Sequence, residues 1–229
     1  MAEQTPESLS HFAIITFSET YWKLDVAERA RLRGEWLARV RGASEAVHLY
    51  QLSGLEAAGD LLVWSAISSA LPDATAAFFS AWAAACQGYR HLFTTRDVLW
   101  GFTRPSQYTK TRSTQEMDPF GPTRQPFLMI YPFVKTTEWY QLDRETRGKM
   151  MMSHIKVGKQ FEDITQLLLY SFGLQDQEFV VVYETADPRR FLALVNDLRS
   201  TEARIYTQRD WPLHAAVYQA DDAALAKWL

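Results

Sequence analysis

His154 carries the strongest chemical signal in the sequence. If residues 143–162 form a helix, the positions that share a face with His154 are apolar or small, among them Met150, Met151 and Gly158. A histidine on such a face is either a core residue with satisfied nitrogens or a ligand. The missing side chain at Gly158 leaves room beside the ring, and methionine supplies an adaptable apolar wall. A single axial histidine with one open face is what a haem pocket needs.

A second group of candidates lies in the segment PFLMIYPFVK at residues 126–135. The two-residue period of a strand places Tyr131 and Lys135 on one face with Phe127, Met129 and Phe133. A phenol and an ammonium group that flank an apolar surface suit a redox-active tyrosine and an anchor for a carboxylate. They equally suit a sheet margin, where Lys135 extends into water and Tyr131 bonds a backbone group. The residues alone leave both interpretations open.

The other polar candidates have weaker patterns. Cys86 is the single cysteine, so no intramolecular disulfide is possible, and its Ala-rich surroundings are typical of a buried small side chain. Arg112 and Arg124 lie in a long polar segment, where they either reach carboxylates of a substrate or are simply solvated. No phosphate loop, nucleophile triad or aromatic-basic stripe is present. The remaining histidines show no metal-binding spacing: His11, His48, His91 and His214.

Composition excludes several classes of protein. The 229 residues are 47% hydrophobic, which is enough for one large core or two small cores. The net charge of -3 gives no field that draws the chain to nucleic acid or to an anionic membrane, so a bound anion must meet a local basic group. The sequence shows no targeting or membrane-inserting segment, and with one cysteine a cytoplasmic location is the simplest expectation. The aromatic content of 14% indicates a bulky core, a subunit interface or a pocket for a flat ligand.

Hydrophobic periodicity predicts a βαββαβ order over residues 1–102. Asp25, with Glu28 three residues later, and Asp73 are the predicted N-caps of the two helices. The expected elements are a strand at 11–21, a helix at 25–42, strands at 45–53 and 60–69, a helix at 73–91 and a strand at 98–102.

The segment 103–125 is rich in Thr, Pro and Gly and predicts a long connection, after which the same order returns over 126–229. The last helix has Asp187 at its N-cap and Pro188 at its first position. The expected elements are strands at 126–135, 164–172, 178–185 and 203–209, helices at 143–162 and 187–200, and a peripheral tail from about 214. Two ferredoxin-like units in tandem, with their sheets packed face to face as an α+β barrel, are the predicted α+β fold.

Two runs of residues in the second half connect the chain with a known family. YPFVKTTEWYQL at 131–142 and MMMSHIKVGKQF at 150–161 closely resemble the C-terminal half of the chlorite dismutase and coproheme decarboxylase superfamily, haem proteins with tandem ferredoxin-like repeats. The resemblance covers most of residues 126–209. It implies that His154 is the iron ligand and that Lys135, Trp139 and Tyr140 line the haem and its propionates.

The resemblance extends to four further residues. Glu202, in the run STEAR, is implied as the acceptor of the second ring N–H of His154, an interaction that fixes the tautomer. Met150 is implied as part of the haem-binding wall. Arg204 matches a position similar to the propionate-binding arginine of the family, although an edge-strand cation would look the same. The run ITQLLLYSFG is the strand that follows the helix of His154. The resemblance implies that Gln166 stands there at the position of the distal arginine that chlorite dismutases share.

The missing arginine argues against efficient chlorite decomposition, because that cation polarises oxyanion intermediates. Tyr131, in a Tyr-Pro-Phe run, is similar to the radical-forming tyrosine of coproheme decarboxylases. The actinobacterial branch of these enzymes also carries a distal histidine before the tyrosine, whereas the corresponding run here, TRSTQEMD, has none. Gln166, water or another group would then assist peroxide deprotonation.

The resemblance therefore implies a coproheme decarboxylase, which uses hydrogen peroxide to convert propionates of iron coproporphyrin into vinyl groups through a radical on Tyr131, with Lys135 positioning the propionate. The alternatives are a chlorite dismutase-like haem peroxidase and a non-catalytic haem-binding protein. The implied partners are the porphyrin, peroxide and further copies of the chain, commonly five in this family. Neither nucleic acid nor membrane insertion is expected.

Overall fold

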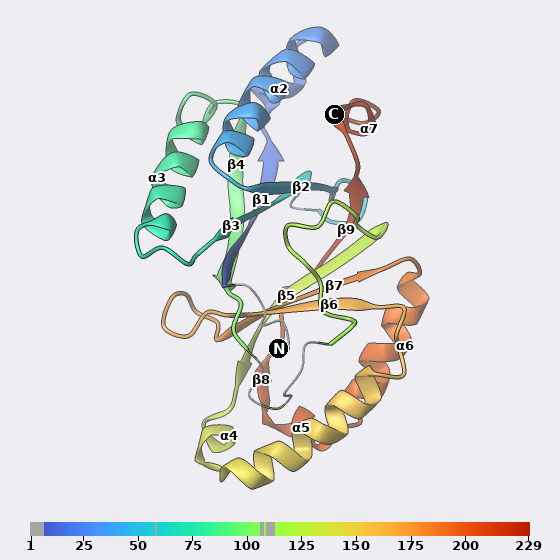
Figure 1. The fold of residues 1–229 in the computed structure, drawn as a ribbon. Coiled ribbons are helices and arrows are strands. Elements are labelled where there is room, and N and C mark those ends of the chain that lie inside the picture. Colours follow the sequence, from blue (N-terminus) through green and yellow to red (C-terminus); the bar gives the residue numbers. More distant parts are fainter. Residues whose placement is uncertain (1–6, 58, 106–107, 109–112) are drawn as a thin grey trace. The chain divides into compact units, whose positions relative to one another are not determined.

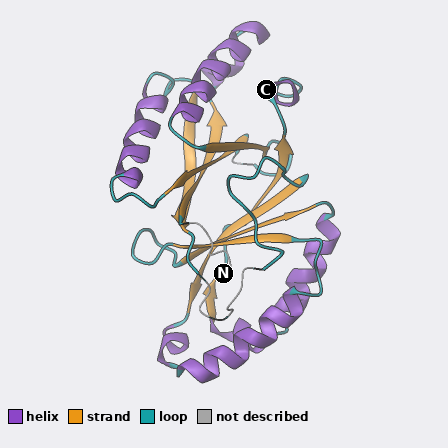
Figure 2. Ribbon diagram, in the orientation of Figure 1, coloured by secondary structure: helices purple, strands orange, loops and turns teal. Residues whose placement is uncertain are grey.

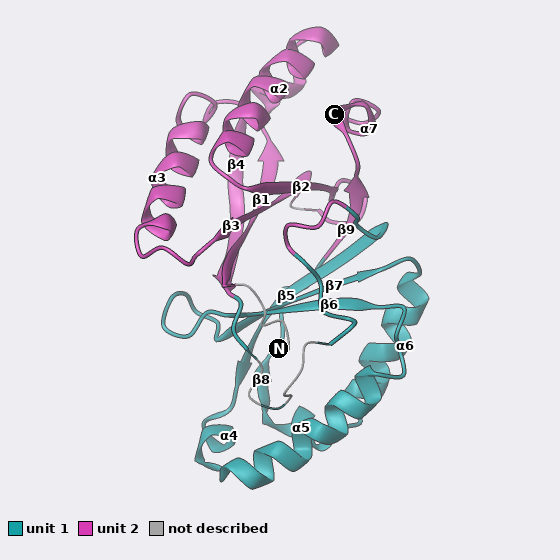
Figure 3. Ribbon diagram, viewed as in Figure 1, with its two compact units in different colours: residues 1–6, 103–118, 123–214 teal, residues 7–102, 119–122, 215–229 magenta. Residues whose placement is uncertain are grey.

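The computed structural model of the chain describes residues 7–57, 59–105, 108 and 113–229. These residues form two compact units (Figure 3). Unit 1 comprises residues 103–118 and 123–214, and unit 2 comprises residues 7–102, 119–122 and 215–229. Each unit thus takes its residues from more than one stretch of the sequence. Arg112, one of the loop arginines considered above, lies outside the described residues.

Unit 2 has the βαββαβ order that periodicity predicts, with additions at its end (Figure 1). β1 pairs antiparallel with β3 and β4, and β2 pairs antiparallel with β3 and β9. The strand order β4–β1–β3–β2 is that of a ferredoxin-like unit, and β9 extends it. The elements are β1 (Ser8–Phe17), α1 (Glu19–Trp22), α2 (Val26–Gly42), β2 (Ala46–Gln51), β3 (Leu61–Ser68), α3 (Ala74–Gln87), β4 (Phe93–Phe102), β9 (His214–Gln219) and α7 (Asp222–Leu225).

The two long helices of unit 2 close tightly on one face of its sheet. Trp36 from α2 and Phe78 and Trp82 from α3 are buried, and they belong to one apolar cluster with Leu9 and Ile15 of β1. Burial of a large apolar side chain stabilises a fold by about 1.5–3 kcal/mol. The helices of unit 2 are therefore held by side chains that fill the space between helix and sheet.

The helix caps of unit 2 only partly follow the prediction. Asp25 caps α2 as expected, since its Oδ1 accepts a hydrogen bond from the backbone N–H of Glu28 at 2.8 Å. The prediction for Asp73 is wrong: its side chain makes no capping bond, and its backbone is already helical. β1 also ends at Phe17 rather than continuing to residue 21, because Ser18 caps the short helix α1 through the N–H of Tyr21 at 3.3 Å.

The prediction of a peripheral tail is wrong. Residues His214–Gln219 form β9, and the short helix α7 follows. Leu225 and Leu229 are buried in the same cluster as the α2 and α3 side chains. The tail contains only short apolar runs, and these gain their burial from strands far away in the sequence, which periodicity cannot show.

Unit 1 repeats the same topology (Figure 2). β5 pairs antiparallel with β7 and β8, and β6 pairs antiparallel with β7. The resulting order, β6–β7–β5–β8, matches that of unit 2, so the predicted α+β fold of tandem ferredoxin-like units is confirmed at the level of each unit. The elements are β5 (Phe127–Lys135), α4 (Thr137–Gln141), α5 (Arg144–Gly158), β6 (Thr165–Tyr170), β7 (Phe179–Thr185), α6 (Pro188–Arg199), the 3-10 helix η1 (Glu202–Tyr206) and β8 (Thr207–Arg209).

Two predicted elements of unit 1 differ from the structure. The expected strand at 203–209 begins with the 3-10 helix η1, and only Thr207–Arg209 are extended. Thr201 starts this turn, since its carbonyl accepts from the N–H of Arg204 at 3.0 Å. The helix expected at 143–162 ends at Gly158.

The end of α5 is tied to the long connection before β5. The Gln115 side-chain amide is buried, and its Nε2 lies 2.8 Å from the carbonyl oxygen of Phe161 and 3.2 Å from that of Ile164. The Gln115 backbone carbonyl accepts from the N–H of Gln166 at 2.8 Å. Part of the connection is therefore a support for α5 and β6 rather than a free loop, because it satisfies carbonyls beyond the helix end.

His11 makes unit 2 sensitive to acid. Its ring is buried among Phe78, Phe79 and Trp82, with ring centroids 4.7–5.8 Å away, and its Nδ1 has no hydrogen-bond partner among the described residues. Burial lowers the pKa of His11 to about 4. The folded state then binds the His11 proton only near pH 4, whereas the unfolded chain binds it near pH 6.5.

We expect His11→Phe to remove this acid sensitivity. Stability from neutral His11 is complete above pH 6.5 and falls toward pH 4, a loss of about 2 kcal/mol at pH 5. Urea unfolding of both proteins should show that the variant gains about this much relative to wild type between pH 8 and pH 5. The comparison isolates His11 because all other groups are shared. Parallel pH profiles for the two proteins would contradict the assignment.

Candidate functional site

α5 differs from α2, α3 and α6, each of which has buried side chains. None of its residues is buried, although those at 146–148, 150–151, 154–155 and 157–158 are half-buried and face one side. α6, its neighbour, buries Phe191 and Leu194. Asp143 caps α5 through the N–H of Thr146 at 2.9 Å, so the helix is well formed locally. The apolar side of α5 is thus available to a ligand.

One face of the unit 1 sheet is less completely buried than the other. Register places Tyr131 opposite Val181, and Tyr183 opposite both Met129 and Gln166, so these side chains share a face. We call it the α6 face, because the Tyr183 ring lies 5.2 Å from that of Phe191 on α6. Leu168 on this face is 40% exposed. On the opposite face, the apolar side chains of β5, β6 and β7 are completely buried or nearly so: Leu128, Ile130, Leu167, Leu169, Val180 and Val182.

His154 is held by a relay of two hydrogen bonds. Its Nδ1 lies 3.2 Å from the Thr201 hydroxyl, and that hydroxyl donates to the carbonyl of Leu198 at 2.7 Å. A hydroxyl has one proton to donate, so Thr201 accepts from His154 and the histidine proton must sit on Nδ1. Nε2 therefore keeps its lone pair, which is the state in which an imidazole binds a metal.

The environment also keeps His154 neutral. Burial, with a smaller contribution from the positive charge of Lys135, lowers the pKa of His154 to about 4. Lys135 and His154 both bond to the turn at residues 201–203, Lys135 through the carbonyl of Ala203 and His154 through the hydroxyl of Thr201. At neutral pH the ring is uncharged and ready to act as a ligand.

The residue that accepts the hydrogen bond from His154 is Thr201, one position before the expected Glu202. Glu202 is exposed on η1, and Thr201 makes the contact instead. Thr201 stands at the N-cap of η1 and is 8% exposed. The turn of η1 directs Thr201 toward α5 and Glu202 toward solvent, which a prediction based on an extended strand could not anticipate.

Tyr131 lies on the α6 face beside a second tyrosine. The Tyr131 and Tyr183 rings are nearly parallel, with centroids 6.3 Å apart. Burial raises the pKa of Tyr131 well above its ordinary value, and the neighbouring hydroxyl of Tyr183 raises it further. Burial likewise raises the pKa of Tyr183 to about 12. Both phenols are protonated at neutral pH, so either can donate a hydrogen bond or give up a hydrogen atom.

Lys135 is anchored at the end of β5. Its Nζ donates to the carbonyl of Ala203 at 3.0 Å and lies 4.5 Å from the Trp139 ring centroid. Burial lowers the pKa of Lys135 to about 8, and Arg204 acts in the same direction, while Glu178 opposes the shift. Lys135 does not extend into water, so the interpretation as a solvated sheet margin is wrong. A partly deprotonated amine near pH 8 is suited to hold and release a proton.

Glu178 organises the region around α4. Its Oε2 accepts from the Tyr140 hydroxyl at 2.5 Å and from the Lys135 backbone N–H at 2.8 Å. Trp139 is 4% exposed, and its ring centroid lies 5.7 Å from that of Tyr206. Lys135, Trp139 and Tyr140 are thus brought together as predicted, and Glu178 is the carboxylate that connects two of them.

The remaining predicted residues lie in different parts of unit 1. Met150 lies on the half-buried side of α5, and a side chain at Gly158 would meet nothing within 4 Å, so the space near His154 is open. Gln166 is exposed on the α6 face, on the same side as Tyr183. Arg204 lies on η1 rather than on a strand, and its guanidinium is 3.3 Å from Asp210. Arg124 lies 3.7 Å from Glu184, on the opposite face of the sheet, and so does not reach the α6 face.

Three residues of the site had no usable signal in the sequence. Thr201 lies between the expected helix at 187–200 and the expected strand at 203–209, where no pattern distinguishes it from its neighbours. Tyr183 lies in the apolar run EFVVVYET, where a tyrosine at a buried position looks like ordinary core. Glu178 precedes a strand, and only the fold brings it to α4. Pairing of polar residues between neighbouring strands would have been the one available hint for Tyr183.

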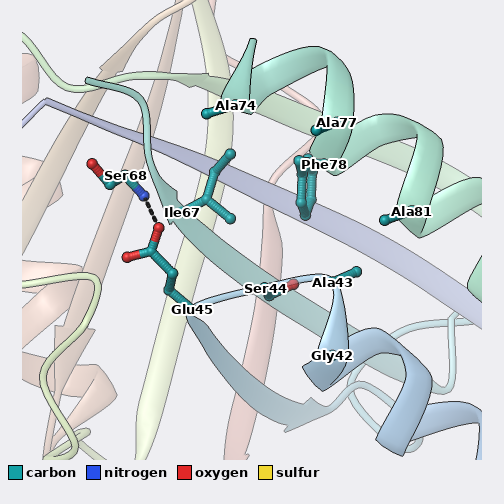
Figure 4. A pocket seen from close by; sticks show the side chains of 10 residues that line it. All are labelled: Gly42, Ala43, Ser44, Glu45, Ile67, Ser68, Ala74, Ala77, Phe78 and Ala81. Carbon is teal, nitrogen blue, oxygen red and sulfur yellow. Dashed lines mark hydrogen bonds between the residues drawn. The ribbon is translucent and has the colours of Figure 1, made fainter. Parts of the chain in front are cut away.

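A hollow in unit 2 differs in character from this site. A shallow hollow of about 330 Å³ in unit 2 lies between the end of α2, β3 and α3 (Figure 4). Glu45 is the one charged side chain labelled there, and its Oε1 accepts from the N–H of Ser68 at 2.8 Å. Residues 7–57, 59–105, 108 and 113–229 contain no group of three or more metal-binding His, Cys, Asp and Glu side chains. Over the same residues, every helix is too short or too polar to traverse a lipid bilayer.

We expect Thr201→Val to release the tautomer of His154. Selective ¹⁵N labelling of histidine in the ligand-free protein at pH 7 should show wild-type His154 protonated at Nδ1 and not at Nε2. Without the hydroxyl, the ring loses a hydrogen bond of about 1 kcal/mol and should populate both tautomers. Thr201→Ser keeps the hydroxyl and serves as control. Identical spectra for Thr201→Val and wild type would refute the relay.

The chain is similar to known proteins over most of its length. The family model described as chlorite dismutase matches residues 19–218. A coproheme decarboxylase from Mycolicibacterium smegmatis is 28% identical over 171 residues, which are 72% of this chain and 69% of that protein. A coproheme decarboxylase from Staphylococcus saprophyticus is 33% identical over 81 residues, about a third of each protein.

Solved structures support the same fold. A variant of the chlorite dismutase from Candidatus Nitrospira defluvii, in complex with cyanide, superposes with a TM-score of 0.80 at 24% identity, over 96% of this chain and 94% of that one. The same enzyme in complex with imidazole gives a TM-score of 0.76 at 22% identity, with the same coverage. Together with the family match over most of the sequence, this shows that the chain belongs to the chlorite dismutase family.

Proposed function

We propose that this protein binds iron coproporphyrin at His154 and, with hydrogen peroxide, converts propionates of that porphyrin into vinyl groups. The observation that carries the proposal is the position of Lys135. Lys135 and His154 bond to the same turn, at Ala203 and Thr201, and the Lys135 Nζ lies 5.9 Å from the ring centroid of Phe133, which shares a strand face with Tyr131. A metal ligand, an oxidisable phenol and an ammonium group thus belong to one site. The similarity to coproheme decarboxylases supports the same conclusion.

The residues present fit a haem-type group. His154 is neutral with a free Nε2, α5 has no buried side chain, and the space beyond Gly158 is open. Exposed and half-buried aromatic rings border the α6 face, and flat macrocycles pack well against such surfaces. When bound, the iron porphyrin supplies the oxidising chemistry with peroxide, and the protein supplies orientation and electrostatics.

Each residue of the site then has a definite task. His154 fixes the metal position through Nε2, and Thr201 fixes the ring. Tyr131 keeps its phenolic proton because its pKa is raised, so it can donate a hydrogen atom, and Tyr183 orients it. Lys135 attracts a propionate and holds a proton at Nζ for the carboxylate. The resulting reaction is a tyrosine-dependent oxidation of a propionate that is held by Lys135.

Gln166 lies on the α6 face, in β6 opposite Tyr183. Its side chain is an amide, and the residues that share its face in β6 are Leu168 and Tyr170, so the strand itself contributes no cation at the Gln166 position. The Arg104 guanidinium, from the connection before β5, lies 5.4 Å from the centroid of the Tyr170 ring. An amide can donate a hydrogen bond to peroxide but cannot polarise a chlorite oxyanion as a cation does. This favours decarboxylation over chlorite decomposition.

We expect Tyr131→Phe to bind iron coproporphyrin like wild type but to decarboxylate it at least about a hundredfold more slowly, because the phenolic hydrogen is lost. Mass spectrometry of the porphyrin after peroxide addition should show products lacking one and two carboxyl groups only with wild type. Tyr170→Phe, on the same face of the sheet, is the matched control and should remain active. His154→Ala should lose the Soret band of the histidine-ligated complex.

Two outcomes would overturn this function. Decarboxylation by Tyr131→Phe at the wild-type rate would remove the tyrosine from the mechanism. Oxygen release from chlorite by the wild-type complex, without loss of carboxyl groups from coproporphyrin, would instead assign a chlorite dismutase-like activity. Binding without either reaction would indicate a haem-binding protein that is not an enzyme.

A further inference from the structure

The cations that the sequence assigns to carboxylate binding already have partners within the chain. Lys135 donates to the carbonyl of Ala203 and lies within 3.4 Å of the Thr207 hydroxyl. Arg204 is 3.3 Å from the carboxylate of Asp210, which also pairs with Arg199 at 3.1 Å. A ligand with several carboxylates would meet only one ammonium group and a neutralised arginine there. The site needs a further donor.

Arg147 is a cation of α5 without a partner. Its Nε is buried and makes no hydrogen bond, and no hydrogen bond or ion pair involves its guanidinium in the described parts of the chain. Two other arginines have a buried nitrogen of this kind: Arg29 lies in unit 2 over the rings of Tyr21 and Trp22, and Arg124 lies beside Glu184. A buried Nε–H without an acceptor is costly, because that group loses contact with water and gains no hydrogen bond from the protein.

Helix geometry places Arg147 on the same side as His154. The two residues are seven positions apart, close to two turns, so they share a face and are separated by about 10 Å along the axis. Both belong to the half-buried side of α5, whereas Lys149 is exposed. The charge of Arg147 also acts to lower the pKa of Tyr140, against the larger effects of burial and Glu178, which raise it.

We propose that Arg147 is a carboxylate-binding residue, which pairs with one carboxylate at the rim of the porphyrin whose metal His154 binds. The inference rests on the proposed function. In a porphyrin the carboxylates hang from the edge of the ring, away from the metal, and Arg147 is displaced from His154 along the helix in the same manner. Its planar guanidinium can donate two parallel hydrogen bonds to a carboxylate.

The neighbourhood of Arg147 explains why a ligand, and not the protein, supplies this carboxylate. Glu178 is the acidic group nearest to Tyr140 in the described contacts, and its Oε2 is already engaged by the Tyr140 hydroxyl and the Lys135 N–H. Glu145, also on α5, pairs with Lys149 on the exposed side. Arg147 is thus positioned for binding specificity: it favours porphyrins with free carboxylates over their esters.

The test compares iron coproporphyrin with its tetramethyl ester, which has the same ring and no carboxylates. Dissociation constants are measured by Soret titration for wild type, Arg147→Gln and Arg147→Lys. Lys149→Gln, which removes the same charge from the exposed side of α5, is the control. We expect Arg147→Gln to weaken binding of the free acid by roughly 5- to 20-fold and to leave the ester unchanged, with partial recovery in Arg147→Lys and no effect of Lys149→Gln.

Other results are equally decisive. Loss of affinity for acid and ester alike would mean that Arg147 acts through packing, and affinities for the acid within twofold of wild type would exclude it from the site. If wild type binds the free acid through His154 but does not decarboxylate it, the proposed reaction fails while the role of Arg147 stands. If wild type binds no iron coproporphyrin, both proposals fail. Circular dichroism of each ligand-free variant checks that the fold is intact.

Discussion

A histidine binds a metal through one nitrogen, and the protein decides which nitrogen stays free. Here the carbonyl of Leu198 takes the single proton of the Thr201 hydroxyl, so His154 must supply the proton of the second hydrogen bond. Three elements have to meet for this relay: α5 carries the imidazole, α6 ends with the carbonyl, and η1 begins with the hydroxyl. The direction of Nε2 therefore depends on the packing of α5, α6 and η1.

The two units show how one topology can be used for different purposes. In unit 2, Trp36 from α2 and Phe78 and Trp82 from α3 fill the space above the sheet. In unit 1, α6 buries Phe191 and Leu194 in the same manner, but α5 buries nothing. A helix that contributes no buried side chain does not gain the usual stabilisation from the sheet, so its attachment relies on contacts such as the Gln115 amide at its end and the Thr201 hydroxyl. Unit 2 is a packed scaffold, whereas unit 1 contains a helix that buries no side chain, as the proposed ligand site requires.

Charge and burial act together near His154. The same desolvation that keeps the imidazole neutral lowers the pKa of Lys135 and raises that of Tyr131. A neutral ligand, a protonated phenol and an amine that titrates near pH 8 are what a site needs to bind a metal and move protons at neutral pH. The protein carries a net charge of -3, so in the proposed function the attraction of an anionic porphyrin has to come from local cations, for which we propose Lys135 and Arg147, rather than from the whole surface.

The sequence by itself determined the doubled βαββαβ order, the strand face that Tyr131 and Lys135 share, and the histidine on an apolar helix face, because each follows from a two- or 3.6-residue period within one element. The resemblance of two short runs then pointed to the family. Only the tertiary structure decided that Thr201 and not Glu202 holds His154, that Tyr183 stands beside Tyr131, and that the tail belongs to the core of unit 2. These contacts join residues from separate elements. The path of a turn such as η1, where a shift of one residue reverses a side chain, is set by packing rather than by local preference.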